Sequence, residues 1–306
     1  MRPNLHGALL LDKPQGVSST GALNKLKGML RAQGLRGKKL PKVGHGGTLD
    51  PFATGLLVVL VGHATTLASY RLKDHKVYGG TIVFGEKTPS GDPETEVCET
   101  GPIPPFESIG PVARSMVGPY LQVPPMHSAK KVQGKRLYEL ARKGREIERE
   151  AVACELHDFT VLQGEEPNLV KFEVSCSSGT FIRTLAEDLA RKLGTVAHLR
   201  TLDRLGSGFI KKCQSLTLDE LQVMTDRGED WTASSSFISL EELLKDWPFL
   251  MVEQEHEERL LEGRLDLLQS LLSKRKEERM VLKGASRIIG FAHRKMGEWA
   301  FLRMFP

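Results

Sequence analysis

Residues 44–61 read GHGGTLDPFATGLLVVLV, a glycine-rich stretch that leads directly into an uninterrupted apolar run. Glycine permits left-handed backbone angles and close approach to a ligand, and the residue before a proline is held in an extended conformation. Asp50, which precedes Pro51, is therefore expected in a fixed turn and not on a helix. The apolar run at 56–61 is too short to cross a membrane and predicts a buried strand. The stretch thus predicts a rigid turn that carries a carboxylate into the start of a core strand.

The composition is that of an ordinary globular protein. The chain has 306 residues, of which 40% are hydrophobic and 26% charged, enough for one large domain and one small domain. The N-terminus lacks the long apolar core of a secretory signal, so a cytoplasmic protein without a membrane span is expected. The cysteines are widely spaced with no CxxC pair, which indicates neither a zinc knuckle nor a disulfide framework; they are Cys98, Cys154, Cys176 and Cys213.

The positive charge of the chain is unevenly distributed. The net charge is +5, and residues 238–306 hold 12 basic and 12 acidic residues, so the whole excess lies in residues 1–237. Two runs carry much of it: Arg31–Lys42 has five basic residues and no acid, and Lys130–Arg149 has eight basic residues and three acids. Each run alone is typical of a solvated face. Because both runs lie within residues 1–237, a surface that contacts phosphates is a serious alternative.

Local patterns predict strands and helices in an irregular order, which favours an α+β fold over a regular series of β-α-β units. Strands are expected at 8–12, 56–62, 77–84, 152–162 and 169–176, the last two forming a hairpin. Helices are expected after a Ser18 or Ser19 cap, near 64–73, 107–116 and 137–142, at 181–193 with Thr180 as its cap, and near 218–224.

The C-terminal part is set off by a change in composition. Residues 226–236, DRGEDWTASSS, are small and polar and predict a linker. Short strand patterns follow within residues 278–305. We therefore expect a large domain at 1–237 and a small β-rich domain at 238–306.

Several familiar chemistries are excluded by the spacing of residues. His45 and Asp50 have no further ligand nearby at a metal-binding spacing, residues 44–55 lack the GK[S/T] ending of a phosphate-binding loop, and no G-x-S-x-G elbow is present. A carboxylate nucleophile or base at Asp50 remains. Such a group needs a cation when buried, and Arg183 is a candidate because a guanidinium stays charged and pairs with both carboxylate oxygens.

Tyr78 and Phe181 could stack on a flat substrate such as a nucleobase. On spacing alone, these residues also fit an Asp-Pro turn, an ordinary strand aromatic and a surface helix arginine. The residues by themselves leave both interpretations open.

Six blocks, in order, resemble the TruB family of RNA pseudouridine synthases over about residues 7–210. They are LLLDKPQGVSS (9–19), GHGGTLDPFATGLL (44–57), KVYGGTIVFGEKTPSGDPE (76–94), PPMHSAKKVQGKRLYELARKG (124–144), CSSGTFIRTLAEDL (176–189) and AHLRTLDRLGSG (197–208). Six blocks in the right order are far more specific than one glycine pattern. The resemblance implies a mixed, mainly antiparallel sheet of the pseudouridine-synthase type flanked by helices. More weakly, the C-terminal tail resembles a small PUA-like domain.

The resemblance also implies a reaction. A uridine in RNA, usually at position 55 in the T-arm of tRNA, is detached at its glycosidic bond, turned, and rejoined through carbon 5. The expected partner is tRNA, held through its T-arm stem-loop by a monomeric enzyme that needs no cofactor and no metal.

Residue roles carry over from the matched motifs. Asp50 would be the nucleophile that attacks the sugar or the base, Arg183 its ion-pair partner, and Tyr78 the ring that stacks on the target. The implied substrate-binding residues are His45, Phe181, Leu202, Gly46 and Lys130, and the implied supports of the site floor are Lys13 and Pro14.

One position departs from the family pattern. The family usually has tyrosine where this chain has Phe181, and phenylalanine cannot accept the proton that leaves carbon 5. We therefore expect another group or a water to take that proton. The alternatives are a non-catalytic tRNA-binding or tRNA-folding module, and a synthase that acts on T-arm-like hairpins in other RNAs.

Overall fold

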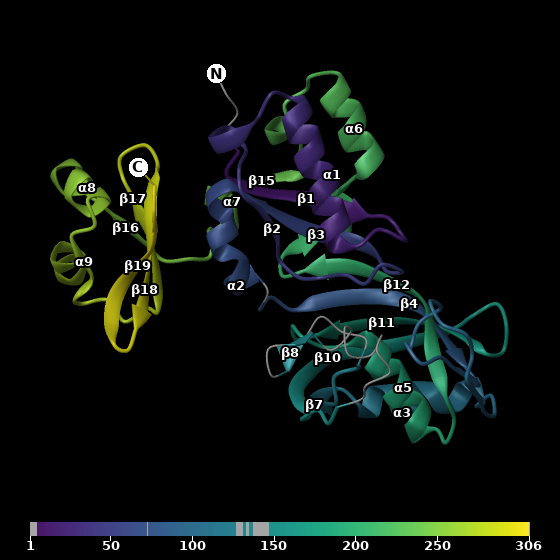
Figure 1. Ribbon diagram of the computed structural model, residues 1–306. Coiled ribbons are helices and arrows are strands. Elements are labelled where there is room, and N and C mark those ends of the chain that lie inside the picture. Colours follow the sequence, from purple (N-terminus) through teal and green to yellow (C-terminus); the bar gives the residue numbers. More distant parts are fainter. Residues whose placement is uncertain (1–4, 72, 127–130, 133–134, 137–146, 306) are drawn as a thin grey trace.

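The computed structural model describes residues 5–71, 73–126, 131–132, 135–136 and 147–305. Within them, eleven strands form one large sheet with the central order β14-β1-β3-β12-β4-β11-β10-β7 (Figure 1). Most neighbouring pairs are antiparallel, and β1·β14 and β3·β12 are parallel. The predicted mixed, mainly antiparallel α+β fold is therefore confirmed.

One half of this sheet is built on the apolar run that opened the sequence. Its strands are β1 (Gly7–Lys13), β2 (Val43–His45), β3 (Thr54–Val61), β14 (Leu216–Thr217) and β15 (Phe237–Ser239). The residues of β3 pack alternately into two different cores, one under helices and one facing the C-terminal sheet. Burial on both faces explains why the run reads LLVVLV instead of alternating with polar residues.

The helices on this half are α1 (Ser19–Ala32) and α6 (Leu218–Asp226), which lie side by side over β1 and β3 (Figure 1). The Ser18 hydroxyl caps α1 by accepting the Gly21 N–H at 3.0 Å. The basic segment that follows α1 contains a short 3-10 helix, Gly37–Lys39.

The other half of the sheet holds β4 (Lys76–Phe84), β7 (Gly118–Gln122), β10 (Val152–Gln163), β11 (Leu169–Cys176) and β12 (Ala197–Ser207), with β13 (Ile210–Lys211) paired to β12. The predicted hairpin is confirmed as β10 and β11, which pair antiparallel. Helices α3 (Phe106–Ser115) and α5 (Ile182–Lys192) cover one face of this half and close its core. Two small hairpins lie outside the sheet: β5 (Glu86–Lys87) with β6 (Glu99–Thr100), and β8 (Lys131–Val132) with β9 (Lys135–Arg136).

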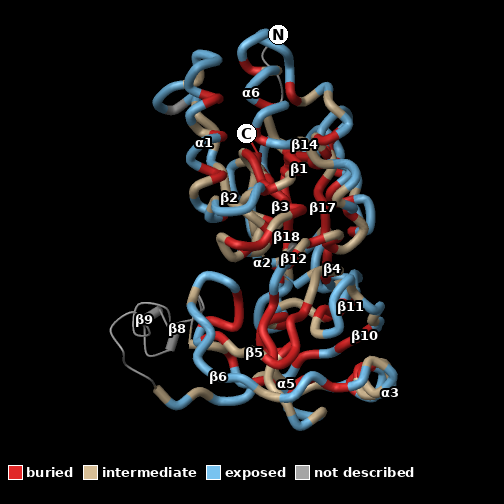
Figure 2. Tube along the Cα trace, turned by 90° about the vertical axis from the view of Figure 1, so that its right-hand side faces the viewer, coloured by how far each residue is buried: buried red, intermediate tan, exposed pale blue. Residues whose placement is uncertain are grey.

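A separate four-stranded sheet forms near the C-terminus. It contains β16 (Phe249–Met251), β17 (Arg279–Lys283), β18 (Ile288–Lys295) and β19 (Glu298–Met304), with α8 (Gln254–Leu261) and α9 (Leu265–Leu272) on one side. One continuous core joins this sheet to β1 and β3, and Figure 2 shows the buried segments along β3, β17 and β18. At this junction α2 (Ala68–Arg71) and α7 (Leu240–Leu243) contribute further apolar side chains. The small β-rich domain is thus confirmed, and its PUA-like character stays a prediction.

Two local predictions are wrong. The cap residue of α5 is Phe181, not Thr180, because the Thr180 hydroxyl donates instead to the Ser177 carbonyl at 2.9 Å. Residues 226–236 are not an open linker: they contain a 3-10 helix, Trp231–Ala233, with Trp231 buried against the α1 core. Small polar residues here serve as turns that return the chain to β1, not as a spacer.

Three other predictions are adjusted, untested or outside the described residues. The helix near 64–73 is a 3-10 helix, Gly62–Leu67, continued by α2. The expected helix at 137–142 falls outside the described residues. The division at 237/238 stays a prediction, since β15 reaches Ser239 within the large sheet and the small sheet begins at Phe249.

Among the described residues, no helix is long and apolar enough to cross a bilayer.

Candidate active site

The loop that carries Asp50 runs from β2 into β3 and is fixed by hydrogen bonds at several points. The Ser19 hydroxyl accepts the Leu49 N–H at 2.8 Å and donates to the Leu49 carbonyl at 2.9 Å, and both groups are buried. Gly46 donates its N–H to the Val58 carbonyl at 2.9 Å. Gly47 has φ 136°, and a Cβ there would lie 3.2 Å from the Arg204 guanidinium. The glycines therefore let the loop pass over a buried cation.

Arg183 lies between two carboxylates. Its Nη2 is 3.1 Å from Oδ2 of Asp50, and its Nη1 is 3.2 Å from Oδ2 of Asp92 and 2.8 Å from the Ser90 carbonyl oxygen. The guanidinium and Asp92 are almost fully buried, whereas the Asp50 side chain retains 36% of its surface. The predicted pairing of Arg183 with Asp50 is therefore present in the structure, and Asp50 is the carboxylate of the two that a substrate can reach.

Asp92 was not among the residues predicted from the sequence. It is held from behind by the Ser90 hydroxyl and by the Glu94 N–H, which donates to its Oδ1 at 3.0 Å. A signal did exist, because Asp92-Pro93 repeats the Asp-Pro pair of Asp50-Pro51 within a matched block. The repetition alone does not reveal that both carboxylates meet one arginine.

The electrostatics of Asp50 follow from this arrangement. Burial raises its pKa, the Arg183 guanidinium lowers it, and the nearby Asp92 carboxylate raises it, with a net increase above the usual range of an aspartate. Arg183 and, more weakly, Lys13 thus favour the ionised form of Asp50.

Arg204 is a second buried cation beside the site. It donates through Nε to the Leu56 carbonyl at 2.6 Å and through Nη2 to the Gly47 carbonyl at 3.2 Å, so it bridges the two ends of the Asp50 loop. It also hydrogen-bonds Tyr78 on β4, although burial of that phenol leaves its pKa raised. Arg204 was not predicted from the sequence. Strand periodicity could have indicated it, because Leu202 and Arg204 are two residues apart and share a face of β12.

Lys13 holds the opposite side of the loop. Its ammonium donates to the carbonyls of Pro14 at 2.9 Å, Val17 at 2.6 Å and Pro51 at 3.2 Å. Burial lowers the pKa of Lys13 to about 8, although the Asp50 carboxylate opposes the shift. The side chain thus ties the residue after Asp50 to the turn that precedes α1.

These groups surround one cavity of about 410 Å³. Asp50, Tyr78, Phe181, Arg183 and Leu202 all line it, together with Gly47, Thr48, Leu49, Lys76, Val152, Ser178, Gly179, Thr180, Ile182 and Arg204. The cavity is mainly apolar and carries the Asp50–Arg183 ion pair in its wall. Such a mixture is typical of sites that bind small organic groups.

The remaining predicted residues lie outside the cavity lining. His45 is at the end of β2, with its Nδ1 3.4 Å from the Gly47 nitrogen, and burial lowers its pKa. Gly46 is buried beside it, and Pro14 is exposed in the turn held by Lys13. Lys130 falls outside the described residues.

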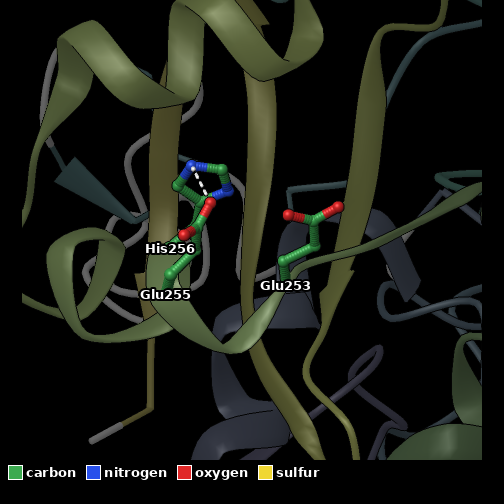
Figure 3. A group of neighbouring side chains, drawn as sticks. All are labelled: Glu253, Glu255 and His256. Atoms are coloured by element: carbon green, nitrogen blue, oxygen red, sulfur yellow. Dashed lines mark ion pairs between the residues drawn. The ribbon is translucent and has the colours of Figure 1, made fainter.

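One group of side chains in the described residues has a composition that could suit a metal ion. Glu253, Glu255 and His256 place their ligand atoms within 4.8 Å of one another at the start of α8 (Figure 3). Both carboxylates are exposed, and Glu255 pairs with His256 at 3.5 Å. The first turn of a helix stabilises carboxylates through its N–H groups, which accounts for this cluster without a cation.

Comparison with known proteins places the chain in a family. The model "TruB family pseudouridylate synthase (N terminal domain)" matches residues 34–182, and "tRNA pseudouridylate synthase B C-terminal domain" matches residues 183–262. A curated relative, "tRNA pseudouridine synthase B" of Syntrophotalea carbinolica, is 36% identical and is matched over 98% of both chains. The protein of the same name from Burkholderia lata is 37% identical, over 96% of this chain and 88% of that one.

Solved structures show the same fold at lower identity. A Cbf5-Nop10-Gar1 complex matches with a TM-score of 0.66 at 21% identity, over 96% of this chain and 80% of that chain. An archaeal box H/ACA sRNP Nop10-Cbf5 complex matches with a TM-score of 0.65 at 19% identity, over 96% and 82%. The sequence relatives carry the assignment: this chain belongs to the TruB family of pseudouridylate synthases and is an isomerase.

Proposed function

We propose that this protein isomerises uridine 55 in the T-arm of tRNA to pseudouridine, with Asp50 as the nucleophile. The single observation that carries the proposal is the position of Asp50: its accessible carboxylate lies in a nucleobase-sized apolar cavity and is paired with the buried Arg183. The names of the relatives, "tRNA pseudouridine synthase B", support tRNA as the substrate.

The chemistry assigned to Asp50 is a covalent exchange. A carboxylate oxygen attacks either the ribose or the uracil ring, the glycosidic bond from nitrogen 1 breaks, and the base turns while it is still held in the cavity. Carbon 5 then bonds to the ribose, the bond to Asp50 breaks, the proton on carbon 5 leaves, and nitrogen 1 takes up a proton from water. Substrate and product have the same composition, so no cofactor or co-reactant is required.

Arg183 has two effects on this nucleophile. It stabilises the ionised carboxylate, and it fixes the orientation of that carboxylate through its contact with Oδ2. Because Asp92 anchors the guanidinium on its other side, Arg183 has little freedom to follow Asp50 or to swing into the cavity.

The apolar wall of the cavity would receive the base. A nucleotide within a folded RNA loop must be extruded before an enzyme can reach it, at a cost of about a few kcal/mol. Stacking on the ring of Tyr78 would return about 1–3 kcal/mol. Leu202, diagonal to Tyr78 across the β12·β4 pair, would contact the base beside that ring.

Phe181 also lines the cavity, and its ring has no hydroxyl that could take the proton from carbon 5. We assign that step to another group or to a water. The side chain of Phe181 then contributes only its ring surface.

The exposed basic residues after α1 would bind phosphates. Arg31 in the last turn of α1 is exposed, and so are Arg36, Lys39 and Lys42 on the segment that connects α1 to β2 and therefore to the Asp50 loop. Phosphate contacts of this kind set the register of the RNA and leave recognition to its shape and splayed bases.

The test uses the full chain and a tRNA transcript that carries 5-tritiated uridine. Formation of pseudouridine releases tritium from carbon 5, and a matched transcript with cytidine at position 55 is expected to release none. Equal release from both transcripts would contradict the assignment to position 55. Release only from hairpins of other RNAs would favour the alternative substrate class.

A further inference from the structure

Strand β7 forms the edge of the large sheet next to helix α5 (Figure 1). Tyr120 and Gln122 are two residues apart on this strand, so their side chains share one face. Gln122 is only 1% exposed, and Tyr120 packs against the core that α3 and α5 close. Neither residue lines the cavity, and neither has a place in the chemistry described above.

Gln122 contacts the beginning of α5. Its Oε1 accepts the Phe181 N–H at 2.7 Å. Phe181 is the cap residue of α5 and makes no side-chain cap of its own. The N–H groups at a helix start have no partner within the helix, so a bond supplied from β7 fixes where α5 begins.

Tyr120 contacts the same helix further along. Its hydroxyl donates a short hydrogen bond to Oδ2 of Asp188, while Oδ1 of Asp188 accepts from Arg191 at 2.6 Å. The two bonds from β7 therefore hold α5 at residues 181 and 188. Arg183 lies between these two points, on the first turn of the helix.

We propose that Gln122, assisted by Tyr120, is a positioning residue that sets helix α5 against β7 and thereby holds the Arg183 guanidinium at Asp50. Two fixed points define both the axial position and the rotation of a short helix, and Arg183 needs both to meet Asp50 and Asp92 together. The inference rests on the proposed roles of Asp50 and Arg183.

The chemistry of Gln122 predicts which substitutions it tolerates. Only its oxygen is engaged, since Nε2 is buried and has no hydrogen-bond partner in the described part of the chain. Glutamate keeps an oxygen acceptor at the same length in either protonation state, whereas methionine keeps the length and loses the acceptor.

The experiment measures single-turnover rate, KM for the tRNA transcript and the pH dependence of the rate, with the full chain. In Gln122→Met the rate is expected to fall about 10- to 100-fold, as for a small misplacement of a catalytic group, with KM nearly unchanged. The rate falls at low pH as Asp50 becomes protonated, and this part of the pH profile is its acid limb. Because Arg183 lowers the pKa of Asp50, displacement of Arg183 moves the acid limb to higher pH. In Gln122→Glu, both the rate and the acid limb are expected to stay close to those of the native protein. Tyr120→Phe is expected to move the acid limb to higher pH by less than Gln122→Met does.

Ile109→Ala is the matched control, because Ile109 is buried on α3 in the same core and its side chain has no hydrogen-bonding group. It is expected to lower the melting temperature without moving the acid limb. If Gln122→Met does not fold, Gln122→Asn replaces it, since its oxygen falls short by one methylene. An acid limb that stays at the native pH in Gln122→Met, or in the Gln122→Asn that replaces it, and in Tyr120→Phe would overturn the proposal, even where the rate falls. A fully active Asp50→Asn protein would instead overturn the proposed function, so the two failures are distinguishable.

Discussion

The Arg183 guanidinium lies 3.1 Å from the Asp50 carboxylate, although Arg183 is in the first turn of a helix and Asp50 belongs to a loop in a distant part of the sequence. The same guanidinium reaches Asp92 at 3.2 Å on its other side. A buried cation between an accessible and an inaccessible carboxylate has a defined orientation, and the first predictions test its consequences.

Arg183→Met is expected to remove the charge that favours ionised Asp50 and to leave Asp92 buried without this cation. Loss of one member of a buried ion pair lowers the free energy of unfolding by about 3–5 kcal/mol. Because the Arg183 charge lowers the pKa of Asp50, the acid limb of the rate profile should move to higher pH. Chemical denaturation and a pH series of single-turnover rates measure both effects. A limb that moved to lower pH would contradict this account of Asp50.

Asp92→Asn is expected to have the opposite effect on pH dependence. The Asp92 carboxylate raises the pKa of Asp50, so its neutralisation should move the acid limb to lower pH. The rate above the limb should stay close to the native rate, because the Ser90 carbonyl and Asp50 still hold the Arg183 guanidinium in place. The same pH series tests this prediction, and limbs that move in the same direction in both variants would refute it.

Deprotonation of Lys13 is expected to limit the rate at alkaline pH. Its pKa is lowered to about 8, and a neutral amine has one hydrogen too few for its three carbonyl partners. The rate is therefore expected to decline as pH rises through about 8. Lys13→Arg, which stays charged, should lose this limb.

The effect of Lys13 on stability has the opposite sign. Between pH 8 and its unfolded value of 10.5, the unfolded chain holds a proton that the folded protein has released. The free energy of unfolding should therefore rise with pH over this range through Lys13, while the rate falls. Denaturation at a series of pH values in the native protein and in Lys13→Met isolates this contribution. A rate that stays constant through the folded pKa of about 8 would exclude the assigned role of the ammonium.

Tyr78→Ala should slow turnover more than it weakens tRNA binding. Removal of one stacking ring costs about 1–3 kcal/mol, which corresponds to roughly 5- to 150-fold in rate if the base stacks only after extrusion. Tyr78→Phe keeps the ring face and serves as the matched control. Filter binding and single-turnover kinetics separate the two quantities, and equal losses in both would argue against stacking on the extruded base.

Replacement of Arg36, Lys39 and Lys42 by glutamine should weaken tRNA binding and flatten its dependence on salt. Removal of a cation that neutralises one phosphate reduces the slope of log affinity against log salt by about 0.7, so three such removals reduce it by roughly 2. Lys274, Lys276 and Lys295, exposed in the charge-balanced C-terminal domain, provide the control triple substitution. An unchanged dependence of affinity on salt in the variant of Arg36, Lys39 and Lys42 would show that these side chains do not contact the phosphates of the RNA.

The sequence predicted those features that depend on local pattern. The run at 56–61 and the hairpin at 152–176 follow from apolar content and turn residues, and the structure has them as β3 and β10–β11. Where a polar residue has two possible partners, local pattern is insufficient. Thr180 can cap α5 or bond Ser177, and tertiary packing selects Ser177. Likewise Trp231 is buried because α1 offers it an apolar surface that the surrounding polar residues do not indicate.

The site was predicted only in part, because local motifs identify some of its residues and contacts between distant elements determine the others. Asp50, Tyr78, Phe181, Arg183 and Leu202 belong to matched motifs, and all five line one cavity. Asp92 and Arg204 act through contacts between distant elements, and only the sheet register and the loop path bring them to Arg183 and Gly47. Gln122 shows no chemical signal at all in the sequence, because its contribution is one hydrogen bond to the backbone of α5.

The most direct test of the central claim is tritium release by Asp50→Asn, which keeps the size of the side chain and an oxygen for Arg183 but cannot act as a nucleophile. The variant should fold and bind the tRNA transcript like the native protein and release no tritium above background. Release at the native rate by a folded Asp50→Asn protein would contradict the account.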